Sequence, residues 1–222
     1  MGEKLTLHAE DGHKLSAYRA TPAGTPRGGL VIVQEIFGVN AHIRRVCDGF
    51  AAEGYVALAP ALFDRVEPGY ETGYGQDDIE RGRNVRQKLG WDLMVTDTRA
   101  AVEQLKKTGG KVGVVGYCMG GSMAWLAATR IPGVAAAVGY YGGAVAEFAD
   151  ESPRCPVLLH FGESDATIPR AQWDKIRDAQ PTVPMHIYPA GHGFNCDARG
   201  SYHEPSARLA RERTLEFLKR HM

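Results

Sequence analysis

Short apolar runs alternate with longer amphipathic stretches along most of the chain. The pattern predicts buried strands at 29–35, 55–59, 112–116, 135–141, 157–161 and 185–188, and helices near 40–53, 77–107 with a break around Gly90, 120–130, 169–178 and 206–220. Two polar–apolar alternations, 4–9 and 14–20, flank a turn at Asp11-Gly12 and predict an antiparallel hairpin. We therefore expect an α/β fold with a mostly parallel central sheet and helices on both of its faces.

The pattern gives no sign of a second domain. No Gly/Ser linker, charge block or internal repeat interrupts it, so we expect one domain over residues 1–222. Residues 63–76 lack a clear period and contain three Gly, two Tyr and one Pro. We interpret them as a loop that either covers a site or is a plain surface loop.

The composition narrows the classes of partner. With 44% hydrophobic and 23% charged residues, the chain is typical of a globular protein, and 26 Lys plus Arg balance 26 Asp plus Glu, so no net field attracts nucleic acid or an anionic membrane. No stretch reaches the roughly 20 apolar residues of a spanning helix, and the N-terminus lacks the apolar segment of a secretory signal. We expect a cytoplasmic monomer that binds a small molecule and needs no cofactor.

The four cysteines, Cys47, Cys118, Cys155 and Cys196, lie far apart in the sequence. They form no Cys-x-x-Cys pair, and no His stands at zinc-ligand spacing from them, so neither a disulfide scaffold nor a metal site is expected. Each is expected to be a reduced thiol that serves either in packing or as a nucleophile.

One cysteine lies in a segment typical of a catalytic nucleophile. Gly116-Tyr117-Cys118-Met119-Gly120 falls where a predicted strand ends and an alanine-rich helix begins. This is the pattern of a nucleophile elbow, a strained turn whose flanking positions must be glycine. The helix N-terminus favours the thiolate. The alternative, Cys118 as a small core residue, is the weaker interpretation because strand, glycine spacing and helix occur together.

An acid and a base follow in the order that this elbow requires. Asp165 comes after the strand predicted at 157–161 and can orient an imidazole, and His192 comes after the strand at 185–188, between two glycines. Taken singly, each is equally well a loop residue, but together they predict a triad of Cys118, Asp165 and His192. The other histidines are assigned no role.

Two backbone amides are candidates for an oxyanion hole. The Met119 amide follows the nucleophile, and the Ile36 amide lies in the loop after the strand at 29–35. Glu35 ends that apolar strand, where an unpaired carboxylate is costly to bury. Glu35 therefore needs a partner or a task, the alternative being a salt-bridged structural acid.

These residues resemble the dienelactone hydrolase family, the carboxymethylenebutenolidases of the α/β-hydrolase fold. The resemblance covers nearly the whole chain and rests on segments 34–38, 116–121, 139–142, 161–162 with Asp165, 190–192 and 212–215. It implies Cys118 as nucleophile, His192 as base and Asp165 as the acid that orients it. It also implies that Glu35 pairs with the resting nucleophile and moves aside when substrate enters.

The chain departs from the family at positions that concern the substrate. In the muconate-pathway enzymes the catalytic His is followed by Ser, and an Arg four positions after the His helps to anchor the substrate carboxylate; here these positions hold Gly193 and Cys196. A second anchoring Arg lies in the middle helix, where Arg81 and Arg83 are both candidates and Arg81 is preferred. With one Arg absent, dienelactone itself is a doubtful substrate.

The prediction is a hydrolase that cleaves a lactone or an activated, enol-type ester through a thioester on Cys118. Phe37, Tyr141 and Phe194 are candidate walls of the substrate pocket, the alternative being core packing. Two other functions stay open. One is a broad carboxylesterase or thioesterase without dienelactone activity; the other is a non-catalytic module that uses the reactive thiol for redox sensing or ligand binding.

Overall fold

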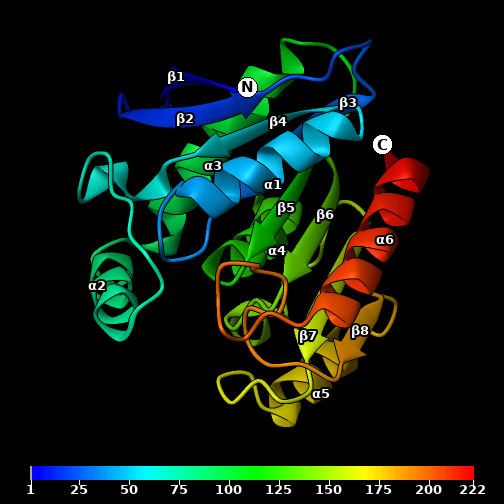
Figure 1. The fold of residues 1–222 in the computed structure, drawn as a ribbon. Coiled ribbons are helices and arrows are strands. Elements are labelled where there is room, and N and C mark those ends of the chain that lie inside the picture. Colours follow the sequence, from blue (N-terminus) through cyan, green and yellow to red (C-terminus); the bar gives the residue numbers. More distant parts are fainter. Residues whose placement is uncertain (1) are drawn as a thin grey trace.

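The computed structural model describes residues 2–222, and its eight strands form one sheet in the order β1-β2-β4-β3-β5-β6-β7-β8 (Figure 1). The strands are β1 (Glu3–His8), β2 (Lys14–Ala20), β3 (Gly28–Val33), β4 (Tyr55–Pro60), β5 (Val112–Tyr117), β6 (Val134–Tyr140), β7 (Val157–Gly162) and β8 (Met185–Tyr188). β1 and β2 form the expected antiparallel hairpin, and β2 also pairs antiparallel with β4. All the other pairs are parallel, which confirms a mostly parallel α/β sheet.

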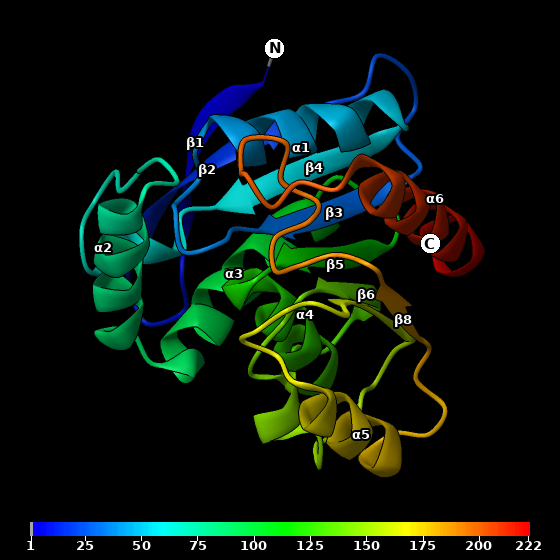
Figure 2. The same cartoon turned by 60° about the horizontal axis from the view of Figure 1, so that its bottom comes forward.

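Helices cover both faces of this sheet. They are α1 (Ala41–Ala52), α2 (Gln76–Gln87), α3 (Trp91–Lys106), α4 (Met119–Arg130), α5 (Arg170–Ala179) and α6 (Glu204–His221), with short 3-10 turns η1 (Leu62–Arg65) and η2 (Val145–Phe148). Figure 2 shows α1 and α6 on one face and α3, α4 and α5 on the other, with α2 set apart at one side. Among residues 2–222, no helix is both long and apolar enough to cross a bilayer.

Burial separates the central strands from the edge. Every residue of β3, β4, β5 and β7 is buried, as continuous apolar runs between two helical layers require. The prediction of a buried strand at 185–188 was wrong in this respect, because only Tyr188 is buried there. β8 is the last strand of the sheet, so one of its sides has no neighbouring strand.

The irregular segment 63–76 packs against the loop that follows β3. Glu71 forms an isolated bridge with Gly38, the Thr72 amide donates to the Phe37 carbonyl at 3.1 Å, and the Tyr74 ring lies edge-on to the Phe37 ring with centroids 4.6 Å apart. These contacts fix the position of the loop 34–38, which carries the predicted oxyanion donor Ile36.

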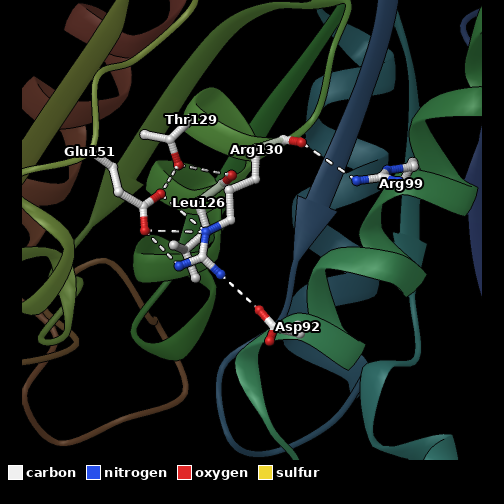
Figure 3. Close-up of polar contacts among 6 residues, drawn as sticks. All are labelled: Asp92, Arg99, Leu126, Thr129, Arg130 and Glu151. Carbon is white, nitrogen blue, oxygen red and sulfur yellow. Dashed lines mark hydrogen bonds and ion pairs between the residues drawn. The ribbon is translucent and has the colours of Figure 1, made fainter.

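An ion-pair cluster holds the C-terminal end of α4 to its neighbours (Figure 3). Arg130 pairs with Glu151 at 2.5 Å and with Asp92, at the start of α3, at 2.9 Å. Thr129 donates to the same Glu151 carboxylate at 2.7 Å, and Arg99 donates to the Arg130 carbonyl at 3.5 Å. Because Cys118 directly precedes α4, this cluster anchors the far end of the helix that positions the nucleophile.

Candidate active site

Cys118 occupies the turn between β5 and α4. Its backbone has φ 56° and ψ −117°, a left-handed conformation that side chains rarely adopt. The turn is held by hydrogen bonds from the Cys118 amide to the Tyr140 carbonyl at 3.0 Å and from the Gly121 amide to the Cys118 carbonyl at 2.9 Å. Cys118 is partly exposed and lines a cavity, so its thiol is accessible to a substrate.

The two glycines of the elbow are required by close backbone contacts. A Cβ atom at Gly116 would lie 1.7 Å from the Gly120 carbonyl oxygen, and one at Gly120 would lie 2.3 Å from the Val33 carbonyl oxygen. Neither backbone group can rotate away as a side chain could. The turn is therefore compatible only with glycine at both positions, which is the physical basis of the spacing seen in the sequence.

His192 and Asp165 meet next to this turn. His192 Nδ1 lies 2.6 Å from Asp165 Oδ2, and the Asp165 side chain is fully buried. Thr167 holds the other carboxylate oxygen, because both its amide and its hydroxyl donate to Asp165 Oδ1, at 2.8 and 2.7 Å. This leaves Nε2 of His192 for Cys118, which lines the same cavity and contributes to the raised pKa of the ring.

The three side chains influence one another's protonation. Burial opposes the charge on His192, but the nearby Cys118 sulfur and the Asp165 carboxylate outweigh it and raise the pKa of His192 to about 10. Burial likewise opposes ionisation of Asp165, yet the hydrogen bond from His192 and the donors of Thr167 lower its pKa below the usual value. The arrangement favours a protonated imidazole held between the Asp165 carboxylate and the Cys118 sulfur, where it can exchange a proton with the thiol.

The two predicted oxyanion donors belong to different elements that border the nucleophile. Met119 is the first residue of α4, and Ile36 follows β3; both line the same cavity as Cys118 and His192. Amides in the first turn of a helix have no partner within the helix and are available to a ligand. Gly82 of α2 packs so closely on Ile36 that a Cβ atom there would lie 2.4 Å from the Ile36 carbonyl oxygen.

The cavity above these groups has a volume of about 470 Å³. Phe37 forms part of its wall, as predicted from the sequence. Residues of α2 and the first residue of α3 complete one side, namely Ile79, Arg83, Arg86 and Trp91. The irregular segment 63–76 is not among the lining residues, so the alternative in which this loop covers the site is wrong; α2, which follows the segment, lines the cavity instead.

Glu35 is buried, and its partner is not the nucleophile. Its Oε1 accepts from Arg199 Nη1 at 3.3 Å, while Oε2 has no hydrogen-bond partner among residues 2–222. The implied resting pair of Glu35 with Cys118 is therefore absent among residues 2–222. The Glu35 carboxylate forms an ion pair with Arg199, and the Cys118 thiol lies beside His192.

Arg81, the preferred anchoring residue in the sequence, does not line the cavity. Its guanidinium pairs with Glu67 and lies over the Tyr70 ring, 5.1 Å from the centroid. The charge of Arg81 is therefore balanced by Glu67 outside the cavity. Arg83, the alternative, lines the cavity, and within residues 2–222 it forms no salt bridge. The preference for Arg81 as the residue that faces the substrate was wrong. Both arginines lie on α2, and the orientation of this helix in the fold determines which of them faces the cavity.

Tyr141 and Phe194 are core residues behind the site and do not line the cavity as expected. Both are fully buried, with ring centroids 5.4 Å apart. The Tyr141 ring packs against His192 with centroids 5.1 Å apart, so it supports the imidazole from the protein side. The core-packing alternative therefore describes both residues.

Among the residues that contact the catalytic groups or line the cavity, sequence reasoning missed Arg199, Arg86 and Thr167. Thr167 stands two positions after Asp165, where a hydroxyl can bond back to a carboxylate, so local turn chemistry could have indicated it. Arg199 and Arg86 carry no local signal. Arg199 reaches the site only because the chain turns between Gly193 and Tyr202.

A cysteine on a strained elbow after a central parallel strand, with an acid and a histidine after later strands, places the protein among the α/β-hydrolases. The sequence matches the Dienelactone hydrolase family over residues 15–222. It is 35% identical to a carboxymethylenebutenolidase of Pseudomonas putida, over 97% of this chain and 95% of that one. The chain belongs to the dienelactone hydrolase family and is a hydrolase that acts on carboxylic ester bonds.

Solved structures share this fold. A protein of Klebsiella pneumoniae that is provisionally assigned as a dienelactone hydrolase superposes with a TM-score of 0.88 at 31% identity, covering 98% of this chain and 97% of that one. A dienelactone hydrolase-like promiscuous phosphotriesterase from metagenomic libraries superposes with a TM-score of 0.76 at 20% identity, over 99% and 98% of the two chains. The second likeness concerns the fold alone.

Proposed function

We propose that this enzyme hydrolyses lactones or enol-type esters that carry a negative charge, through a thioester on Cys118. The observation that carries the proposal is the contact of one cavity with Cys118, His192 and Arg199. A nucleophile, a base and a cation therefore face the same bound molecule. The proposal joins a mechanism, set by Cys118 and His192, with a substrate class, set by the arginines.

In the acylation step the Cys118 thiolate attacks the ester carbonyl, and a carbon–sulfur bond forms. The negative charge on the carbonyl oxygen is stabilised by the Met119 and Ile36 amides. The intermediate then collapses, the carbon–oxygen bond to the leaving group breaks, and the enolate takes up a proton, for which the His192 imidazolium is the adjacent donor. A thiolate leaves more readily than most alcoholates, so the route suits acidic leaving groups such as enols.

In the deacylation step neutral His192 removes a proton from water, which attacks the thioester carbonyl. The carbon–sulfur bond breaks and the product leaves as a carboxylic acid, with Cys118 again a thiolate beside imidazolium. Asp165 keeps Nδ1 of His192 protonated, so Nε2 is the nitrogen that exchanges protons with both sulfur and water.

The charge of the cavity supports an anionic substrate. Arg83, Arg86 and Arg199 line it, and within residues 2–222 Glu147 is the acidic residue of the lining. Arg86 is committed elsewhere, because it stacks over the Trp91 ring at 3.9 Å and donates to the Leu89 carbonyl at 2.5 Å. Arg83 forms no salt bridge among residues 2–222, and Arg199 contacts Glu35 through Nη1, so both guanidinium groups keep N–H donors that can meet a substrate carboxylate. The enzyme would thus recognise an anion without an Arg at position 196.

The test compares steady-state hydrolysis of a dienelactone with that of a neutral aryl ester. We expect Cys118→Ala to abolish both activities. Arg199→Ala should lower kcat/KM for the charged lactone about 10- to 100-fold, the range of a lost charge-assisted hydrogen bond, and change the neutral ester little. Arg81→Ala is the matched control, because Arg81 pairs with Glu67 outside the cavity, and it should leave both rates unchanged. Equal losses on both esters in Arg199→Ala would instead favour a broad carboxylesterase.

The thioester is tested separately by trapping. His192→Asn lacks the base for deacylation, so brief exposure to an aryl ester should leave one acyl group on the peptide that contains Cys118, detected by mass spectrometry and removed by hydroxylamine. Cys155 is a partly exposed thiol outside the cavity and serves as the internal control. Acylation spread equally over Cys118 and Cys155 would contradict the mechanism.

A further inference from the structure

Three buried side chains that are distant in the sequence converge beside the catalytic cavity. They are Glu35 at the end of β3, His42 in α1 and Cys196 in the loop before α6, and one ligand atom from each lies within 4.8 Å of the other two. Their side chains are 1%, 5% and 0% exposed. We propose that Glu35, His42 and Cys196 bind a divalent zinc ion. This proposal does not depend on the substrate proposed above.

Two of the three residues hold a buried polar atom without a partner. Glu35 Oε2 and His42 Nε2 form no hydrogen bond among residues 2–222. An unsatisfied buried carboxylate oxygen or imidazole nitrogen is costly, because it has lost its water and gained nothing in exchange. One cation between these atoms would satisfy both at once.

His42 is oriented as a metal ligand would be. Its Nδ1 lies 2.9 Å from Asp197 Oδ1, and Asp197 is held in turn by Arg45 at 2.9 Å. When Nδ1–H donates to a carboxylate, Nε2 carries the lone pair, and this carboxylate–histidine pairing is the usual outer partner of a histidine bound to zinc. Asp197 thus fixes the tautomer that the proposal needs.

The sulfur of Cys196 is also held in place. Burial raises the pKa of the Cys196 thiol to about 11, so the thiol holds its proton until a metal ion displaces it; the Tyr74 hydroxyl and the Ala198 amide lie beside the sulfur. Tyr74 is positioned by Asn40, whose side-chain amide donates to the Tyr74 hydroxyl at 3.0 Å. The three ligands would be the thiolate formed when Cys196 loses its proton, the neutral imidazole of His42 and Oε2 of Glu35, whose other oxygen keeps its ion pair with Arg199.

The dimensions and the chemistry agree with zinc. Sulfur, nitrogen and carboxylate oxygen are the ligand types of zinc, and bond lengths of about 2.0 to 2.3 Å in a tetrahedron place ligand atoms roughly 3.5 Å apart. Atoms that lie within 4.8 Å of one another need only close by about 1 Å. A surface hollow of about 370 Å³ borders His42, Tyr74 and Ala198 and offers a route of entry.

Sequence motifs for metal sites, which rest on the spacing of Cys and His, do not identify these three ligands. Those motifs are built on a Cys-x-x-Cys pair, and this chain has no such pair. Here the ligands stand at positions 35, 42 and 196, and only the packing of α1 against the loop after β8 brings them together. A bound ion would join these segments, so zinc should raise the Tm of the folded chain.

The test is calorimetric titration of the whole chain with Zn²⁺, in a Cys118→Ser background so that the catalytic thiol cannot compete. We expect one equivalent of bound zinc, lost in Cys196→Ser and in His42→Gln. Asp197→Asn should bind zinc about 10- to 100-fold more weakly, the usual effect of losing such an outer partner. Asp48→Asn, an exposed change on the same helix, is the matched control and should bind as the parent does.

The absorption spectrum of bound Co²⁺ reports thiolate coordination directly, so this test does not depend on the stability of the variants alone. Co²⁺ bound to the Cys118→Ser chain should show a thiolate-to-cobalt charge-transfer band and the intense visible bands of a tetrahedral site. The charge-transfer band should vanish in the Cys118→Ser, Cys196→Ser double variant. Absence of zinc binding at several-fold excess, or unchanged binding after Cys196→Ser and His42→Gln, would overturn the proposal.

Discussion

Gly193 and Arg199 occupy adjoining space, so that a Cβ atom at Gly193 would lie 2.4 Å from Nη1 of Arg199. The glycine also has φ 76°, a conformation that disfavours any side chain. Position 193 holds Ser in the muconate-pathway enzymes that the sequence resembles. The absence of a side chain at position 193 therefore leaves room for the Arg199 guanidinium beside the catalytic histidine.

We expect Gly193→Ala to displace the Arg199 guanidinium. The measured quantity is the ratio of kcat/KM for an anionic lactone to that for a neutral ester, because a general disturbance of neighbouring His192 cancels in this ratio. The ratio should fall about tenfold or more, as for loss of a charge-assisted hydrogen bond. In the double variant with Arg199→Ala the ratio should fall no further than in Arg199→Ala alone. An unchanged ratio would show that Gly193 does not position the arginine.

The elbow makes a prediction about stability. In Gly116→Ala the new methyl group would lie 1.7 Å from the Gly120 carbonyl oxygen, and both groups belong to the backbone. We expect urea unfolding to give a free energy lower by about 3 kcal/mol or more, or no folded protein at all. Gly24→Ala is the control, since nothing lies within 4 Å of its Cβ position, and it should change stability by less than about 0.5 kcal/mol. Similar stabilities for the two variants would contradict the geometry of the turn.

Most of the fold was predictable because its signals are local. Apolar runs, Asp11-Gly12 and the glycines around Cys118 act over a few residues, and the helices and strands fall within a few positions of the predicted ranges. The exposure of β8 was not predictable in this way. Whether an apolar strand is central or outermost depends on the order of strands in the sheet, which a single run of residues does not contain.

The site residues likewise divide into those that local sequence signals predicted and those that depend on the path of the chain. Cys118, Asp165 and His192 each follow a strand, so their meeting at one edge of the sheet is a consequence of topology that could be anticipated. The pairing of Glu35 with Arg199 could not, because it depends on the path of the loop after His192. Positions 81 and 83 are likewise equivalent by composition, and only the rotation of α2 directs one of them into the cavity.

The ion pair of Arg130 with Glu151 at the end of α4 should contribute measurably to stability. Hydrogen bonds from Arg130 lower the pKa of Glu151 below its ordinary value of 4.5. A lowered pKa means stability that is present above pH 4.5 and lost as the pH falls through the folded value. Glu151→Gln should therefore cost about 1 to 2 kcal/mol at pH 7, less any solvent screening, and the cost should shrink in acid.

The control for this pair is Glu103→Gln, which removes the exposed partner of Lys106 on α3. Exposed pairs of this kind contribute about 0.5 kcal/mol or less. Urea unfolding of both variants at pH 7 and at pH 3 separates the two cases. A cost for Glu151→Gln that matches Glu103→Gln, or that is the same at both pH values, would show that the cluster does not stabilise α4.

The protonation of His192 gives the sharpest test of the triad. Its raised pKa, about 10, should appear as the midpoint of its ring signal in an NMR titration, well above the usual 6.5. Cys118→Ala removes the sulfur beside the ring, so the midpoint should fall, while Asp165 still holds it above that of an exposed histidine. Because the folded value is raised, the stabilising contribution is complete below pH 6.5 and is lost as the pH rises through about 10. The unfolding free energy of the parent should therefore decline toward that of His192→Asn across this range, whereas a midpoint near 6.5 would exclude a resting thiolate–imidazolium pair.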